Sequence, residues 1–151
     1  MRPQDLGEMR EIKNSISKVL RDPIIRLLLK SSNLTPVQFE TILIDIIGRM
    51  NQEKILNYDE KRKLRSKTVS RGAFIRTLTQ ARERVRKAIY TILLLSYLGV
   101  LDSSFFEDYQ QLFERLREYL RDVEESEKTK MILKRVEQEI EARIDDLVRS
   151  L

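Results

Sequence analysis

Apolar residues recur at helical spacing along almost the whole chain. Near the N-terminus, for example, Leu6, Met9, Ile12 and Ile16 are three or four residues apart, which places them on one face of a helix. No convincing stretch of the sequence alternates apolar and polar residues as a half-buried strand does. The pattern therefore predicts an all-α fold.

Capping residues divide this pattern into separate helices. Asp22 and Thr35 are each followed by proline. In both pairs the first residue supplies an N-cap side chain, and the proline is favoured as the first helical residue. A polar, basic helix is predicted over residues 57–67. Ser70 is expected to cap a long helix that ends near Gly99.

The long helix after Ser70 has one continuous apolar stripe. With Phe74 at its centre and about 100° per residue, Gly72, Arg76 and Gln80 fall on the opposite side. Residues 88–101 then form an uncharged apolar run of 14 residues. A membrane span needs roughly 20, so the run is interpreted as a buried helix, either central to the core or shared between subunits. The stripe consists of Phe74, Leu78, Ala81, Val85, Ala88, Ile92 and Leu95.

Residues 102–151 are predicted to form a C-terminal helical arm. The segment 124–130 contains no apolar residue, and the apolar pattern resumes after it in a different register. This favours a turn or a stutter over one uninterrupted coiled coil, so the arm is either one helix or a hairpin. A heptad-like seam precedes the segment, made of Phe105, Tyr109, Leu112, Leu116, Tyr119 and Val123.

The composition excludes several kinds of chemistry. The chain has no cysteine and no histidine, which excludes disulfides, thiol catalysis and the usual zinc sites. It has no phosphate-loop glycine motif, and carboxylate pairs such as Glu118 with Asp122 are common on solvated helices. We therefore expect no enzymatic activity, no cofactor and no metal. The N-terminus has no apolar signal region, which predicts a cytoplasmic protein without a membrane partner.

Charge is distributed unevenly along the chain. Residues 54–87 hold 12 Lys and Arg against 3 Asp and Glu, whereas residues 102–151 hold 9 against 14. A concentrated positive segment is typical of a nucleic-acid-binding surface. The acidic arm should face away from nucleic acid and pair with itself or with another protein. We accordingly predict a DNA-binding domain over residues 1–101 and an arm over residues 102–151.

Candidate contact residues follow from the helix assignment. The N-terminal part of a recognition helix enters the major groove, where arginine bonds guanine and glutamine bonds adenine. The base-contact candidates are Arg71, Arg76, Thr79 and Gln80. Basic side chains on the preceding helix and turn suit phosphates, as do the free N–H groups beside a helix cap. The phosphate-contact candidates are Lys61, Arg62, Lys63, Arg65, Lys67, Ser70 and Lys87.

Two short motifs carry a family resemblance. The tripeptide LTP at residues 34–36, followed by TVSRGAFIRTLTQARERVRK at residues 68–87, resembles the helix-turn-helix of bacterial sigma factor region 4. The likeness covers about a third of the chain. It implies that Val69 is the buried turn residue and Ser70 the cap, and that Arg71, Arg76 and Gln80 face the groove. The LRSKT sequence at residues 64–68 departs from the family, because it lacks the usual small residue and glycine.

Together these observations predict a dimeric helix-turn-helix protein that binds DNA. It would act as a transcriptional regulator or a chromatin-associated factor in the cytoplasm, at the nucleoid. Two alternatives stay open. The basic face could meet an acidic protein, which would make the chain a helical adaptor or assembly subunit. The same arginines could instead contact RNA phosphates without reading a groove.

Overall fold

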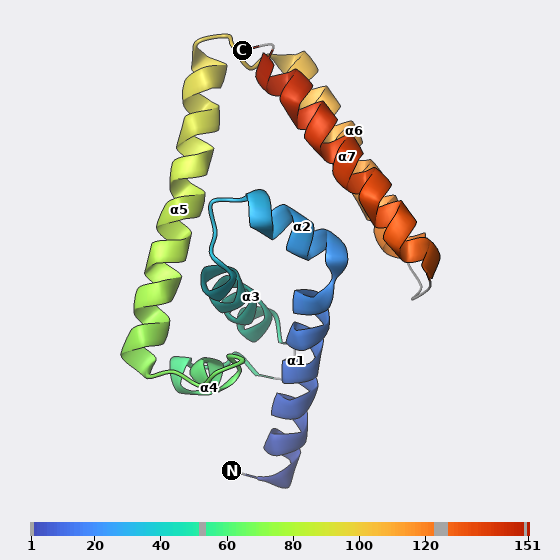
Figure 1. Ribbon diagram of the computed structural model, residues 1–151. Coiled ribbons are helices and arrows are strands. Elements are labelled where there is room, and N and C mark those ends of the chain that lie inside the picture. The colour runs from blue at the N-terminus through green and yellow to red at the C-terminus, as the bar shows by residue number, and fades with distance from the viewer. Residues whose placement is uncertain (1, 52–53, 123–126, 150) are drawn as a thin grey trace. The chain divides into compact units, whose positions relative to one another are not determined.

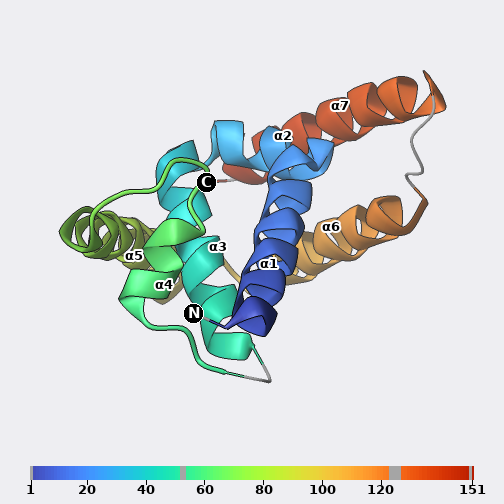
Figure 2. The same ribbon diagram turned by 90° about the horizontal axis from the view of Figure 1, so that it is seen from below.

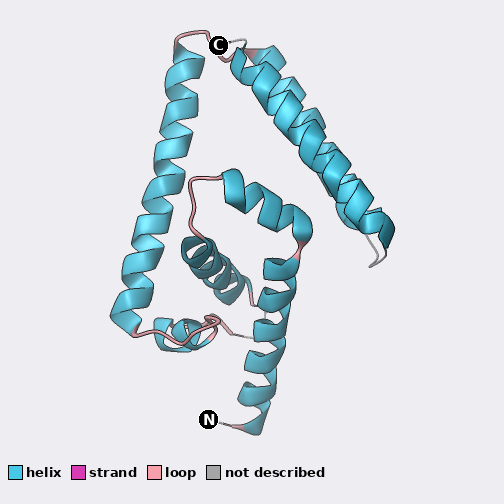
Figure 3. Cartoon of the chain, viewed as in Figure 1, coloured by secondary structure: helices cyan, strands magenta, loops and turns pink. Residues whose placement is uncertain are grey.

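A computed structural model describes residues 2–51, 54–122, 127–149 and 151, without the side chains of residues 119–122, 127–130 and 132. The described residues form seven helices and no strand, which confirms the all-α prediction (Figure 3). None of the described helices is long and apolar enough to cross a bilayer.

The helices divide between two compact units. Unit 1 comprises residues 1–88 and unit 2 comprises residues 89–151, so the boundary falls within α5. In chain order the helices of Figure 1 are α1 (Pro3–Arg21), α2 (Pro23–Ser31), α3 (Pro36–Met50), α4 (Tyr58–Lys63), α5 (Arg71–Tyr97), α6 (Ser103–Asp122) and α7 (Glu127–Arg149).

The predicted caps define the ends of the helices in unit 1. Asp22 accepts hydrogen bonds from the backbone N–H of Ile24 at 2.8 Å and of Ile25 at 3.2 Å. Thr35 and Gln38 form a reciprocal capping box at the start of α3. Because these bonds satisfy N–H groups that have no partner within the helix, short-range sequence signals are enough to place the boundaries.

The core of unit 1 is built around α3. Both α1 and α4 pack against this helix (Figure 2). The rings of Tyr58 and Phe74 lie 6.2 Å apart, which joins α4 to the start of α5. Six buried side chains form the centre of the core: Ile16, Ile44, Leu56, Leu64, Phe74 and Leu78.

The basic helix is shorter than predicted. It ends at Lys63 rather than near residue 67, and the N–H of Leu64 donates to the carbonyl of Lys61 at 3.0 Å in a tighter final turn. Arg65 and the backbone of Ser66 bond instead to Glu40 of α3. Tertiary bonding therefore overrides the helical tendency of the sequence.

The apolar stripe of α5 is buried only in its first part. Phe74, Leu78 and Ala81 are buried as predicted, whereas Val85 is exposed. The interpretation of the run 88–101 as a buried helix is wrong for the single chain, because most of its large side chains are exposed. These are Ile89, Tyr90, Ile92, Leu93, Leu94, Tyr97, Leu98 and Val100.

Glycine terminates α5 as predicted. Gly99 has φ +75°, a left-handed conformation that side chains with a Cβ rarely adopt. Its N–H donates to the carbonyl of Ser96 and that of Val100 donates to Leu95, each at 3.0 Å. These two bonds form a Schellman motif, which satisfies the carbonyls at the helix end.

The C-terminal arm is a hairpin of two helices. α6 and α7 pack against each other with Leu112, Val136 and Ile140 buried, and Arg115 forms an ion pair with Glu139. Of the predicted seam, Phe105 and Leu116 are half-buried and Tyr109 is exposed. The Tyr119 side chain, Val123 and residues 124–126 of the predicted turn lie outside the described residues.

Candidate nucleic-acid interface

The candidate interface begins at the N-terminus of α5. The hydroxyl of Ser70 accepts a hydrogen bond from the N–H of Ala73 at 3.1 Å, so Ser70 caps the helix as predicted. Ser70, Arg71 and Gly72 are all exposed. A capped and exposed helix N-terminus presents N–H groups and a partial positive charge to an anion.

The four base-contact candidates lie on the outer side of α5. Arg71, Arg76, Thr79 and Gln80 are exposed, while Phe74 on the same helix is fully buried. The predicted orientation of the helix is therefore confirmed. The positive charge of Arg71 is only partly compensated. Its guanidinium lies 3.7 Å from the Asp59 carboxylate, but both side chains are exposed, so water weakens their attraction.

Lys61 is not available to a phosphate. Its side chain is buried, and its ammonium lies 2.9 Å from the carboxylate of Asp45 in α3. Asp45 is only 2% exposed, and it also contacts Arg82 at 2.7 Å and Arg49 at 3.1 Å. The assignment of Lys61 as a phosphate contact is corrected: it forms a buried ion pair that ties α4 to α3.

Arg65 is withdrawn from the phosphate contacts for the same reason. It is buried, its Nε lies 2.9 Å from the Glu40 carboxylate, and its Nη1 donates to the hydroxyl of Thr41 at 3.4 Å. The N–H and the hydroxyl of Ser66 both donate to the other oxygen of Glu40 at 2.5 Å. Glu40 thus fixes the turn between α4 and α5.

The other phosphate-contact candidates lie at the surface. Arg62 is half-buried and donates to the carbonyl of Val69 at 3.3 Å, so it mainly supports the turn. Lys63, Lys67 and Lys87 are exposed. We call the exposed group around the start of α5 the α4–α5 surface; it consists of Lys63, Lys67, Ser70, Arg71, Arg76, Thr79 and Gln80.

Sequence reasoning missed the two carboxylates that position this surface. Glu40 and Asp45 lie in α3, and Asp45 stands between Ile44 and Ile46 in an otherwise apolar stretch. A carboxylate among core residues needs a cation and hydrogen bonds. That requirement was a usable signal for a buried partner, although the sequence does not say which of the 12 basic residues of the segment 54–87 supplies it.

The pKa of Glu40 makes this arrangement sensitive to acid. Burial raises its pKa, but hydrogen bonds from Ser66 and the charge and hydrogen bond of Arg65 outweigh that effect and hold it below the ordinary value of 4.5. A carboxyl group with a lowered pKa in the folded state stabilises the fold fully above about pH 4.5. The contribution is lost as the pH falls through the folded pKa, because the unfolded chain binds the proton more readily.

We predict that Glu40→Gln reduces the free energy of unfolding by about 2 kcal/mol at pH 7, as expected for lost bonds to a charged group. The difference from the unchanged chain should narrow as the pH falls below about 4.5. Urea unfolding from pH 7 to pH 3 measures both effects. Glu11→Gln, at an exposed position of α1, serves as the control. A constant difference across the pH range would contradict the prediction.

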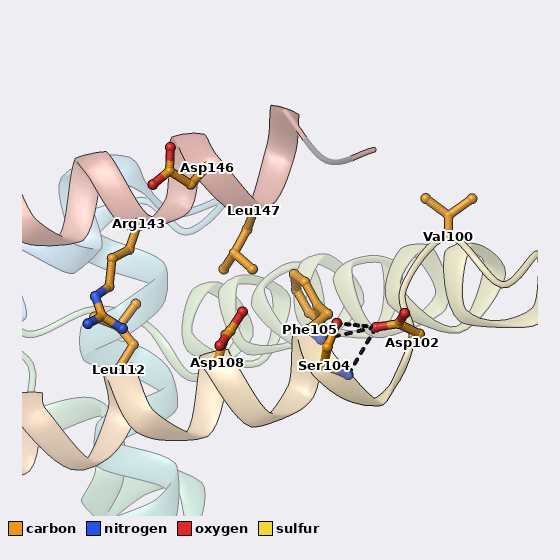
Figure 4. A pocket seen from close by; sticks show the side chains of 9 residues that line it. All are labelled: Val100, Asp102, Ser104, Phe105, Asp108, Leu112, Arg143, Asp146 and Leu147. Atoms are coloured by element: carbon orange, nitrogen blue, oxygen red, sulfur yellow. Dashed lines mark hydrogen bonds between the residues drawn. The ribbon is translucent and has the colours of Figure 1, made fainter.

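A separate cavity lies within unit 2. It has a volume of about 540 Å³ and is lined by residues of α6, α7 and the segment before α6, including Asp108, Arg143 and Asp146 (Figure 4). The Asp102 carboxylate at the edge of this cavity caps α6. Its pKa is lowered mainly by the hydrogen bond from the Ser104 hydroxyl, and further by those from the backbone N–H groups of Phe105 and Ser104. The carboxylate of Asp102 is therefore explained by helix capping.

Comparison of the chain with protein-family models, with curated proteins and with solved structures found no match. The residues and their geometry therefore carry the functional argument alone.

Proposed function

We propose that the chain binds duplex DNA through the α4–α5 surface, as a dimeric helix-turn-helix regulator or chromatin-associated factor. The observation that carries the proposal is the group of exposed basic residues around the capped start of α5, with Arg76 and Gln80 on its outer side. In such a unit the second helix enters the major groove while the preceding segment contacts the backbone.

The distribution of charge supports a polyanionic ligand for unit 1. Residues 1–88 hold 20 Lys and Arg against 10 Asp and Glu, whereas residues 89–151 hold 9 against 14. Glu40 and Asp45 account for two of the ten acidic residues, and both are buried in ion pairs rather than exposed at the surface. Long-range attraction to DNA therefore acts on unit 1.

Salt dependence tests the proposal. If the affinity for duplex DNA depends on several phosphate contacts, the logarithm of the association constant should fall by about 0.9 per contact for each tenfold rise in salt. Fluorescence anisotropy with duplex DNA, duplex RNA and polyglutamate separates the three candidate functions. Tighter binding of RNA favours the RNA alternative, and equal binding of polyglutamate and DNA at moderate salt rules out the regulator.

Base reading has its own prediction. Arg76→Ala or Gln80→Ala should relax the sequence preference selected from a random DNA pool, at a cost of about 1–3 kcal/mol for the preferred site. Lys63→Ala should weaken all sequences alike, because a phosphate contact carries no sequence information. If Lys63→Ala changes the preference while Arg76→Ala leaves it unchanged, the assignment of the two roles is wrong.

A further inference from the structure

Unit 2 leaves most of its large apolar side chains exposed. Of the 22 exposed large hydrophobic residues in the described chain, 15 lie in residues 89–151. Only four hydrophobic residues of this unit are buried among those described: Leu101, Leu112, Val136 and Ile140. Exposed apolar surface on this scale marks an interaction site.

One part of this surface is the end of α5. Tyr97 is 91% exposed, and five other large side chains between residues 89 and 98 are each more than half exposed. At about 100° per residue, the six cover roughly half of the helix circumference. We call this group the α5 apolar face; it consists of Ile89, Tyr90, Leu93, Leu94, Tyr97 and Leu98.

The area of the α5 apolar face is close to what a dimer needs. A large side chain has an accessible surface of about 150–250 Å². Six such side chains that are more than half exposed therefore offer on the order of 600 Å² of accessible surface to a partner. A partner in a stable interface contributes about 800 Å². Monomers seldom leave a contiguous apolar patch larger than a few hundred Å² exposed.

We propose that a second copy of this chain covers the α5 apolar face, with the two α5 segments running antiparallel about a two-fold axis. The segment 88–101 has no charge, so it offers nothing that would select a charged partner. A two-fold interface uses the same surface of both copies, and this surface carries no charge that would repel its own copy.

The flanking charges determine the orientation. Arg84, Arg86 and Lys87 precede the apolar segment, and Asp102, Glu107 and Asp108 follow it. In an antiparallel pair the basic end of one copy lies beside the acidic end of the other, whereas a parallel pair places like charges together. Opposite charges at the rim of an interface favour the correct register and disfavour the wrong one.

Single-cysteine variants test the pairing without background, because the chain has no cysteine. In an antiparallel pair the axis passes near Leu93 and Leu94, so Leu94→Cys should form a disulfide-linked dimer on mild oxidation. Measured along the helix axis at 1.5 Å per residue, the two copies of residue 98 would be roughly 13 Å apart. That separation is too great for a disulfide, so Leu98→Cys should stay unlinked. Equal linkage of both variants would overturn the antiparallel pairing.

Light scattering on the full chain, without nucleic acid, measures the association itself. We expect twice the chain mass at micromolar concentration, reduced to the monomer by Leu94→Glu and unchanged by Leu6→Glu, which alters a similarly exposed leucine of α1. A native monomer overturns the proposal, as does a monomer that binds anionic phospholipid vesicles instead. This inference rests on the dimer of the proposed function and assigns its pairing surface. DNA binding by the α4–α5 surface can hold or fail whatever the light scattering shows, because that measurement contains no DNA.

Discussion

Asp45→Asn is expected to lower the free energy of unfolding by about 3–5 kcal/mol, the range for breaking one partner of a buried ion pair. The substitution leaves the Lys61 ammonium buried without a carboxylate, at a position that is only 5% exposed. Arg49 and Arg82 lose the same partner, but both are about half exposed and can turn to water. The loss therefore arises mainly from Lys61.

Urea unfolding measures this effect, and Asp59→Asn provides a matched control. Asp59 also contacts two cations, Arg62 and Arg71, but its side chain is 56% exposed. Exposed ion pairs contribute up to about 1 kcal/mol, so the control should change little. Adding Lys61→Met to an Asp45→Leu variant should recover much of the stability, because no buried charge is then left unpaired. Equal losses for the Asp45 and Asp59 variants would contradict the prediction.

The parts of the fold that sequence predicted correctly are those set by neighbouring residues. Asp22, Thr35 and Ser70 bond to N–H groups two or three residues further on, so their roles can be inferred from a short window. The left-handed backbone of Gly99 is likewise a local property. The helix periodicity of Phe74, Leu78 and Ala81 correctly gave the inner side of α5.

The parts that sequence predicted wrongly depend on distant partners. Lys61 and Arg65 have the same local character as exposed Lys63 and Lys67, but their partners are 16 and 25 residues earlier in the chain. The net charge of the segment therefore cannot distinguish the buried Lys61 and Arg65 from the exposed Lys63 and Lys67. The same limit explains the early end of the basic helix, because Arg65 leaves the helical path to reach Glu40.

The apolar run after Ala88 shows a third limit. Its composition indicates burial but not the surface that covers it, and core and subunit interface are chemically alike. Within one chain the side chains of Leu93, Leu94 and Tyr97 are exposed. The sequence therefore identifies a strongly apolar segment, and the exposure of its side chains is known only from the structure.

Replacing four exposed cations of the α4–α5 surface by alanine should have the largest effect on function. Lys63 and Lys67 are the phosphate contacts among them, so the salt slope falls by about 1.8, while the changes at Arg71 and Arg76 remove two base contacts. At about 0.15 M salt the two phosphate contacts account for roughly a thirtyfold loss of affinity for duplex DNA. Two base contacts of about 1 kcal/mol each account for roughly another thirtyfold at the preferred site. The changes are Lys63→Ala, Lys67→Ala, Arg71→Ala and Arg76→Ala, all at exposed positions, so the fold should be retained.

A matched variant separates local contacts from net charge. It removes four exposed cations from α1 and α2, so both variants lower the net charge of +5 to +1. Long-range attraction then falls by a similar amount in each, and at 0.15 M salt it is screened beyond about 8 Å. Anisotropy titrations at several salt concentrations should show the salt slope retained in the control and lowered by about 1.8 in the α4–α5 variant. Equal losses in both would mean that DNA responds to overall charge and that the α4–α5 surface is not the binding site. The control carries Arg10→Ala, Lys13→Ala, Lys18→Ala and Lys30→Ala.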